Sequence, residues 1–129
     1  MFLKGARKVP LIPAESLPFF EKVIYLPMVL IILERDRENV EKGPFKLKRP
    51  YVAIIEHALK EARKELNDTK QYLKEHNMKV IRGNHDDTFT EYVFFHGGYE
   101  EHRRYLNVRL RNRVEELLEL YLSIAKQAN

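Results

Sequence analysis

The stretch that decides the fold is residues 50–76, PYVAIIEHALKEARKELNDTKQYLKEH. Its apolar positions recur at spacings of three and four residues, which is the period of one face of an α-helix. They are Val52, Ile55, Leu59, Ala62, Leu66, Thr69 and Leu73, and Ile54, Ala58 and Tyr72 widen the stripe. At ~100° per residue the stripe covers roughly 160° of the helix surface. So broad a stripe predicts a helix that contacts two neighbours at the centre of a helical bundle.

The residues before this helix divide into an arm and a helical region. Residues 1–13 contain three basic residues, two prolines and no acid, so we expect an extended basic arm. Ser16 is a preferred residue type for the N-cap of the first helix. Pro27 removes a backbone donor and predicts a kink or a break, with a second helix over about residues 27–41. Gly43-Pro44 then ends the helical region.

The period changes to two after the long helix. Residues 78–95 are rich in β-branched and aromatic side chains on either side of the turn sequence Gly83-Asn84-His85-Asp86-Asp87. Pairing Arg82 with Thr88 around this turn places Lys79 opposite Glu91, a favourable pair of opposite charges. The pattern therefore predicts a β-hairpin.

Gly97-Gly98 ends the second strand, and the residues after it return to a helical pattern. Glu100 and Glu101 suit the first turn of a helix, where the helix dipole favours negative charge. The apolar positions that follow form one stripe: Leu106, Leu110, Val114, Leu117, Tyr121 and Ile124. We therefore expect a long C-terminal helix over residues 99–128.

These segments predict a mainly α fold, a helical bundle of three to four helices with one β-hairpin inserted before the C-terminal helix. A chain of 129 residues, 44% hydrophobic and 33% charged, can bury such a core as a single domain without cross-links. The expected division of residues 1–129 is the basic arm (1–13), the helices (14–76), the β-hairpin (78–95) and the C-terminal helix (99–128).

Composition excludes several classes of function. The chain has no cysteine, which removes disulfides, thiolate nucleophiles and thiolate-ligated metals. Its longest apolar run, residues 23–33, is about half the ~20 residues that a membrane span needs, so we expect a cytoplasmic protein with no membrane partner. Neither a Gly-x-Ser-x-Gly elbow nor a glycine-rich phosphate loop is present. We therefore expect a protein that is not an enzyme, with no catalytic residues and no cofactor.

Three histidines are the candidates for a metal site. Folding the predicted hairpin brings His76, at the end of the central helix, near His96, at the end of the second strand. His102 follows in the first turn of the predicted last helix, beside two glutamates. Imidazoles and a carboxylate bind zinc at about 2.0–2.1 Å, or titrate together below about pH 6.5. Because no His-x-x-x-His spacing is present, we assign no metal site and keep these histidines as weak candidates.

The sequence leaves two classes of function open. The interpretation that we favour is a small protein–protein interaction, regulatory or assembly domain that binds another protein or a second copy of itself. It rests on aromatic and apolar residues in excess of what a simple helix seam uses. The alternative is a nucleic-acid-binding regulator with the hairpin as a wing, because the net charge is +4 and basic residues cluster in acid-free stretches. The phosphate-contacting candidates are Lys46, Lys48, Arg49, Arg104 and Arg111.

Overall fold

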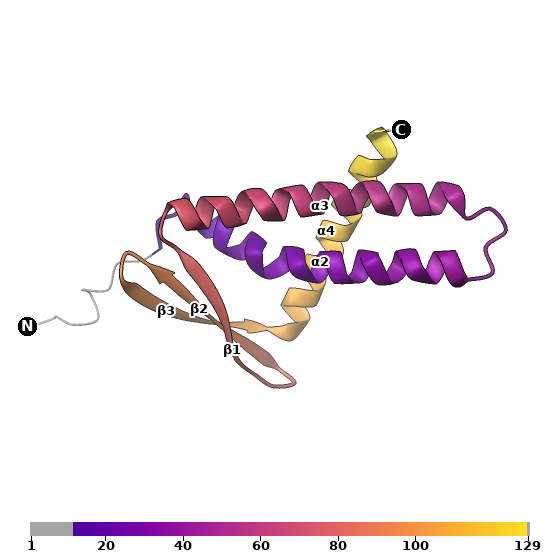
Figure 1. Cartoon of the computed structure of the whole chain (residues 1–129). Coiled ribbons are helices and arrows are strands. Elements are labelled where there is room, and N and C mark those ends of the chain that lie inside the picture. The colour runs from indigo at the N-terminus through magenta and orange to yellow at the C-terminus, as the bar shows by residue number, and fades with distance from the viewer. Residues whose placement is uncertain (1–11, 129) are drawn as a thin grey trace, which may run out of the picture.

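The computed structural model describes residues 12–128 (Figure 1). Most of the basic arm expected over residues 1–13 therefore lies outside the described part. Two long helices lie side by side, and a three-stranded antiparallel sheet lies near one end of this pair. The last helix crosses the helix pair. The elements are α2 (Leu17–Lys42), α3 (Arg49–Glu75), β1 (Lys79–His85), β2 (Phe89–His96), β3 (Tyr99–Leu106) and α4 (Asn107–Ala128).

The expectation of a helical bundle with an inserted β-hairpin is wrong. Residues 99–106 do not begin the last helix; they form a third strand that pairs along the whole of β2. Gly97 and Gly98 adopt positive φ angles of 55° and 81°, and a two-residue turn of this kind reverses a strand tightly. The result is a β-meander flanked by helices, and α4 begins only at Asn107.

The expected break at Pro27 is also absent. Helix α2 runs without interruption through Pro27. Proline removes one backbone hydrogen bond from the ladder. The neighbouring Leu26 and Val29 are fully buried in the helical core, so packing holds the helix through this position. Ser16 makes no side-chain cap; its hydroxyl lies 3.0 Å from the hydroxyl of Tyr72 on α3.

The β-hairpin exists, but its predicted register is wrong. Arg82 pairs with Tyr92 and not with Thr88. Strand β1 continues into the expected turn, with a bulge after Arg82. The Asp86 carboxylate accepts hydrogen bonds from the backbone amides of Thr88 and Phe89, at 2.8 and 2.7 Å, and these bonds lower its pKa. This side chain therefore closes a shorter turn. Because the partner of Arg82 moves by an even number of residues, the same side chains stay on the same face.

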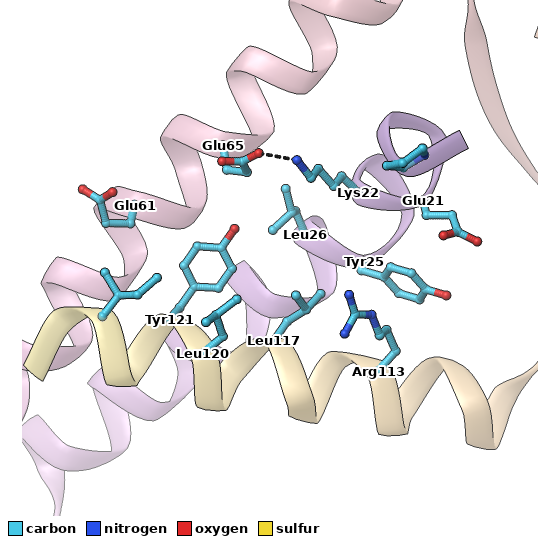
Figure 2. A pocket seen from close by; sticks show the side chains of 12 residues that line it. Glu21, Lys22, Tyr25, Leu26, Glu61, Glu65, Arg113, Leu117, Leu120 and Tyr121 are labelled. Atoms are coloured by element: carbon cyan, nitrogen blue, oxygen red, sulfur yellow. Dashed lines mark hydrogen bonds and ion pairs between the residues drawn. The ribbon is translucent and has the colours of Figure 1, made fainter. Parts of the chain in front are cut away.

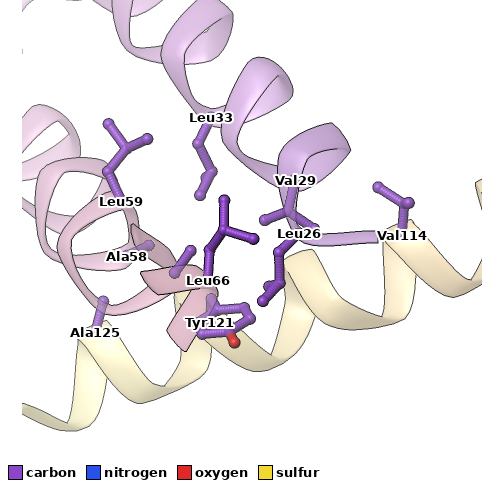
Figure 3. Close-up of a cluster of buried hydrophobic side chains, with 10 residues drawn as sticks. Leu26, Val29, Leu33, Ala58, Leu59, Leu66, Val114, Tyr121 and Ala125 are labelled. Carbon is purple, nitrogen blue, oxygen red and sulfur yellow. The ribbon is translucent and has the colours of Figure 1, made fainter. Parts of the chain in front are cut away.

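The prediction that the helix over residues 50–76 contacts two neighbouring helices agrees with the structure, although the bundle expected around it does not exist. Helix α3 packs against both α2 and α4, and its buried side chains come from the predicted stripe. Figure 3 shows the resulting helical core, in which Tyr121 of α4 lies beside Leu66 of α3. The cluster also contains Leu26, Val29, Leu33, Ala58, Leu59, Ala62, Val114 and Ala125.

A second core joins the sheet to the helices. Alternate residues of β2 are buried, and Phe94 among them has no exposed surface. Its ring stacks on that of Phe20 in α2, with the ring centroids 4.8 Å apart. Leu73 from the end of α3 and Leu110 from the start of α4 complete the same cluster. The helix-facing side of the sheet thus closes over one end of the helix pair.

Candidate functional site

The structure does not bring the three candidate histidines together. His76 is exposed, and its ring stacks on that of Tyr72 with the centroids 4.0 Å apart. His96 is buried at the end of β2 on the helix-facing side of the sheet. His102 pairs with Val93 across β2 and β3, which places it on the opposite side of the sheet. Within residues 12–128, no group of three or more histidine, aspartate and glutamate side chains is arranged to hold a metal ion.

His102 instead lies between two glutamate carboxylates on the surface of the sheet. Its two ring nitrogens lie 3.1 Å from carboxylate oxygens of Glu100 and Glu91. These hydrogen bonds raise the pKa of His102, and the bond to Glu100 has a larger effect than the bond to Glu91. Gly83 makes room for this arrangement, because a Cβ there would lie 2.7 Å from a carboxylate oxygen of Glu91. On the outer face of the sheet, His102 therefore forms ion pairs with Glu91 and Glu100 when its imidazole is protonated.

The basic candidates are divided among three places. Lys46, Lys48 and Arg49 lie at the connector between α2 and α3, at the end of the helix pair remote from the sheet (Figure 1). The Arg104 guanidinium lies over the ring of Phe89 on the outer sheet face, 4.1 Å from its centroid. Arg111 belongs to α4. The five side chains therefore do not form one continuous phosphate-binding surface.

A shallow apolar groove separates α2 from α4 on one side of α4. It has a volume of about 650 Å³ and is lined mainly by Met28, Ile32, Leu110, Val114 and Leu118. Arg111 and Glu115 also line it, together with Arg82 and His85 of β1. The sequence pattern placed Leu110 and Val114 of this lining in the core, and both are buried.

A more enclosed pocket lies on the other side of α4, where α2, α3 and α4 meet (Figure 2). Its volume is about 390 Å³. The apolar part of the lining comes from Leu26 of α2 and from three residues of α4, which we call the α4 ridge: Leu117, Leu120 and Ile124. Glu21, Lys22, Tyr25, Glu61, Glu65, Arg113 and Tyr121 supply its polar groups.

The polar groups of the pocket are suited to binding. The Lys22 ammonium donates to a carboxylate oxygen of Glu65 at 2.7 Å. The pKa of Tyr121 is raised to about 12, mainly by burial and to a smaller extent by the negative charges of Glu65 and Glu61. Burial also raises the pKa of Tyr25. Both hydroxyls are therefore protonated at neutral pH, where they serve as hydrogen-bond donors and not as bases.

The α4 ridge is the part of this site that sequence reasoning missed. Its residues follow the i, i+3, i+7 spacing of a helix that packs on another helix. Yet Leu120 is 51% exposed and Ile124 39% exposed. The predicted apolar stripe included Leu117 and Ile124 but treated them as core. The available signal was Leu120, an apolar residue outside that stripe.

Comparison with known proteins gives a family but no solved relative. No solved structure matches the chain. No helix among residues 12–128 has the length and apolar character needed to cross a bilayer. The chain is 37% identical over 114 residues to a protein of Bacillus subtilis (strain 168) named uncharacterized protein YhjD, covering 88% of this chain and 95% of the relative. The model of the YhjD protein family matches residues 11–126. The chain therefore belongs to the YhjD protein family.

Proposed function

We propose that this protein is a small non-enzymatic interaction domain that binds through the α4 ridge and the pocket beside it. The observation that carries the proposal is the exposure of Leu120 and Ile124 at the rim of a pocket. A contiguous exposed apolar patch beside a concave surface marks an interaction site.

The partner that this face fits best is a second copy of the chain. An interface with two-fold symmetry needs a projection and a recess on the same patch, so that each copy inserts into the other. The exposed Leu120 and Ile124 at the rim would supply the projection, and the pocket would supply the recess. The pocket lining also carries both signs of charge, with Lys22 and Arg113 opposed by glutamates on α2 and α3. A lining of mixed charge does not repel its own copy.

The expected affinity is modest. Burying the exposed half of Leu120 or Ile124 contributes about 1 kcal/mol for each side chain. A symmetric contact counts each of them twice, and the flanking parts of the pocket add to this area. Association costs at least about 4 kcal/mol of lost freedom of motion. The four side chains therefore only offset the cost of association, and a dimer with a micromolar dissociation constant needs about 8 kcal/mol more from the flanking parts of the pocket.

Sedimentation equilibrium between about 1 and 300 µM protein tests this proposal, because that range brackets a micromolar dissociation constant. We expect the wild type to change from monomer to dimer and Leu120→Glu to stay monomeric, because the interface would bury an unpaired charge. Leu47→Glu is the matched control, since it makes the same change at another exposed leucine, and it should dimerise like the wild type. A wild type that is monomeric throughout, or a dimer that survives Leu120→Glu, would refute the proposal.

We place this function in the cytoplasm. The support is compositional: none of the 129 residues is cysteine, so the fold draws nothing from an oxidising compartment. Fractionation of cells that produce the full-length protein measures the location directly. Recovery from the culture medium would contradict it.

A further inference from the structure

The connector between α2 and α3 carries a concentration of positive charge. We call residues 42–51 the connector tip. It contains Lys42, Lys46, Lys48 and Arg49, and no acidic residue occurs from residue 42 to residue 55. The tip forms the end of the long helix pair, away from the sheet and from α4 (Figure 1). An acid-free basic cluster therefore lies at one end of the helix pair.

Three large apolar side chains are exposed at the same place. Leu47 is 72% exposed, Tyr51 53% and Phe45 43%. The rings of Phe45 and Tyr51 contact each other, with centroids 5.6 Å apart. None of the three belongs to either core cluster. Burial within the fold therefore does not explain why they are apolar.

The tip is held in shape by short-range contacts. The Lys48 ammonium donates to the backbone carbonyl of Glu41, at 2.7 Å, near the end of α2. Lys42 pairs with Glu38 at 3.3 Å. Within residues 12–125, Lys46 and Arg49 make no ion pair with a carboxylate, so their charges face outward unneutralised. The prolines at positions 44 and 50 restrict the backbone on both sides of these residues.

We propose that the connector tip docks the protein on the surface of an anionic membrane. In this arrangement Lys46, Lys48 and Arg49 contact lipid phosphates and carboxylates, while Leu47 and the ring of Phe45 enter the boundary between headgroups and acyl chains. Basic residues interleaved with aromatic and aliphatic ones are typical of such peripheral contacts. Surface docking requires no spanning helix, and the expectation of no membrane partner rested only on the lack of one.

Two features favour lipid over nucleic acid as the partner. Leu47, the most exposed of the three apolar side chains, is aliphatic and gains nothing by stacking on a base, whereas it gains free energy by entering hydrocarbon. The tip is also short, and the other basic candidates, Arg104 and Arg111, lie on different elements. A nucleic acid would therefore find few phosphate contacts around it.

The expected losses of vesicle affinity follow from an electrostatic contribution of the basic residues and a hydrophobic contribution of Leu47. Each lysine or arginine near an anionic surface strengthens binding about fivefold. The triple variant K46Q/K48Q/R49Q should therefore weaken vesicle binding about 100-fold. Leu47→Ala should weaken it about fivefold, because roughly half of the leucine side chain leaves water on docking. Neither variant changes a core contact, and K48Q removes only the exposed bond to the Glu41 carbonyl, so melting temperatures should stay close to that of the wild type.

Co-sedimentation of the full-length protein with vesicles tests the proposal. The vesicles are phosphatidylcholine alone, or phosphatidylcholine with about 30 mol % phosphatidylserine to supply negative charge. We expect binding to the anionic vesicles only, and loss of most of it between about 0.1 and 0.5 M NaCl, because salt screens surface charges. Absence of binding to the anionic vesicles at low salt would overturn the proposal.

A matched control distinguishes the effect of the connector tip from the effect of the protein's overall net charge. The variant K60Q/K64Q/K70Q removes the same three charges from exposed positions on α3, and we expect it to bind vesicles almost as well as the wild type. Equal loss in both triple variants would overturn the proposal, because any basic surface would then suffice. Fluorescence anisotropy with single-stranded and duplex DNA covers the other class of partner. Binding to DNA that is lost in the tip variant but unchanged in Leu47→Ala, without vesicle binding, would assign the tip to nucleic acid.

Discussion

Replacing Phe94 by alanine tests the central claim about the fold, that the sheet closes over the helix pair with one of its faces. Phe94 has no exposed surface, and its ring stacks on Phe20 of α2. The adjacent Phe95 points to the opposite side of the sheet, where it is only partly buried and lies under the Lys79 ammonium. The two substitutions remove the same atoms from neighbouring positions, so their difference reports the packing alone.

The magnitude follows from burial. Truncating a fully buried phenylalanine costs about 3–5 kcal/mol, because transfer free energy is lost and a cavity remains. For a domain of this size that corresponds to a melting temperature lower by roughly 12–20 °C. Phe95→Ala should cost about 1–2 kcal/mol, since less of its area leaves water on folding. Phe94→Leu keeps most of the volume and should fall between the two.

Urea denaturation followed by circular dichroism measures these differences as changes in the free energy of unfolding. Wild-type domains have a stability of roughly 5–15 kcal/mol, so Phe94→Ala can leave too little to measure. Phe94→Leu then supplies the comparison with Phe95→Ala. A cost for Phe95→Ala equal to or above that for the Phe94 variants would refute the assignment of the faces and, with it, the packing of the sheet on α2.

Three further predictions concern the sheet, the turn between β2 and β3, and the start of α4. The pKa of His102 is raised in the folded state, so its contribution to stability is complete below 6.5 and is lost as pH rises through the folded value. His102→Gln should therefore lower the melting temperature at about pH 5.5 and change it little at about pH 9. Gly98→Ala should cost about 1–2 kcal/mol in urea denaturation because φ is positive there, and Gly98→Asn should cost less. Asn107→Ala removes hydrogen bonds to Thr90 and to the Asp86 carbonyl and should cost about 1–3 kcal/mol, measured in the same way.

Sequence reasoning predicted the elements whose period is unambiguous. Residues 50–76 carry a helical stripe over many turns, and α3 occupies nearly the same range, Arg49–Glu75. The β-hairpin was predicted because its two segments are rich in strand-forming residues. Its register failed because the turn is set by one hydrogen-bonding side chain, Asp86, which a pattern of β-branched residues does not reveal.

The third strand was missed for a different reason. Residues 99–106 contain four charged residues and a histidine, so their alternation is not one of apolar and polar side chains. On the outer face His102 is held by carboxylates, and on the helix-facing side Arg103 pairs with Glu101. This strand is specified by ion pairs and by the two-residue turn before it. The turn, Gly97-Gly98, was the signal available in the sequence.

The candidate sites were harder to predict than the fold, because they depend on which apolar residues the fold leaves uncovered. Periodicity placed Leu117 and Ile124 in a core, but the structure buries Leu117 only partly and leaves Ile124 39% exposed. The five basic candidates do not come together in the structure. Their division among a connector, a strand and a helix comes from tertiary structure, which no local pattern contains.

The α4 ridge and the connector tip make one joint prediction, because they lie on different elements and do not compete for surface. A dimer formed through α4 leaves both tips uncovered, and two tips on one membrane bind more tightly than one. Vesicle affinity of the wild type should therefore rise by about tenfold or more across the concentration range of dimerisation. Leu120→Glu, with its tip intact, should bind with the lower affinity at every concentration. Affinity that is independent of concentration in a wild type shown to dimerise would mean that the dimer presents only one tip to the membrane, which contradicts bivalent docking.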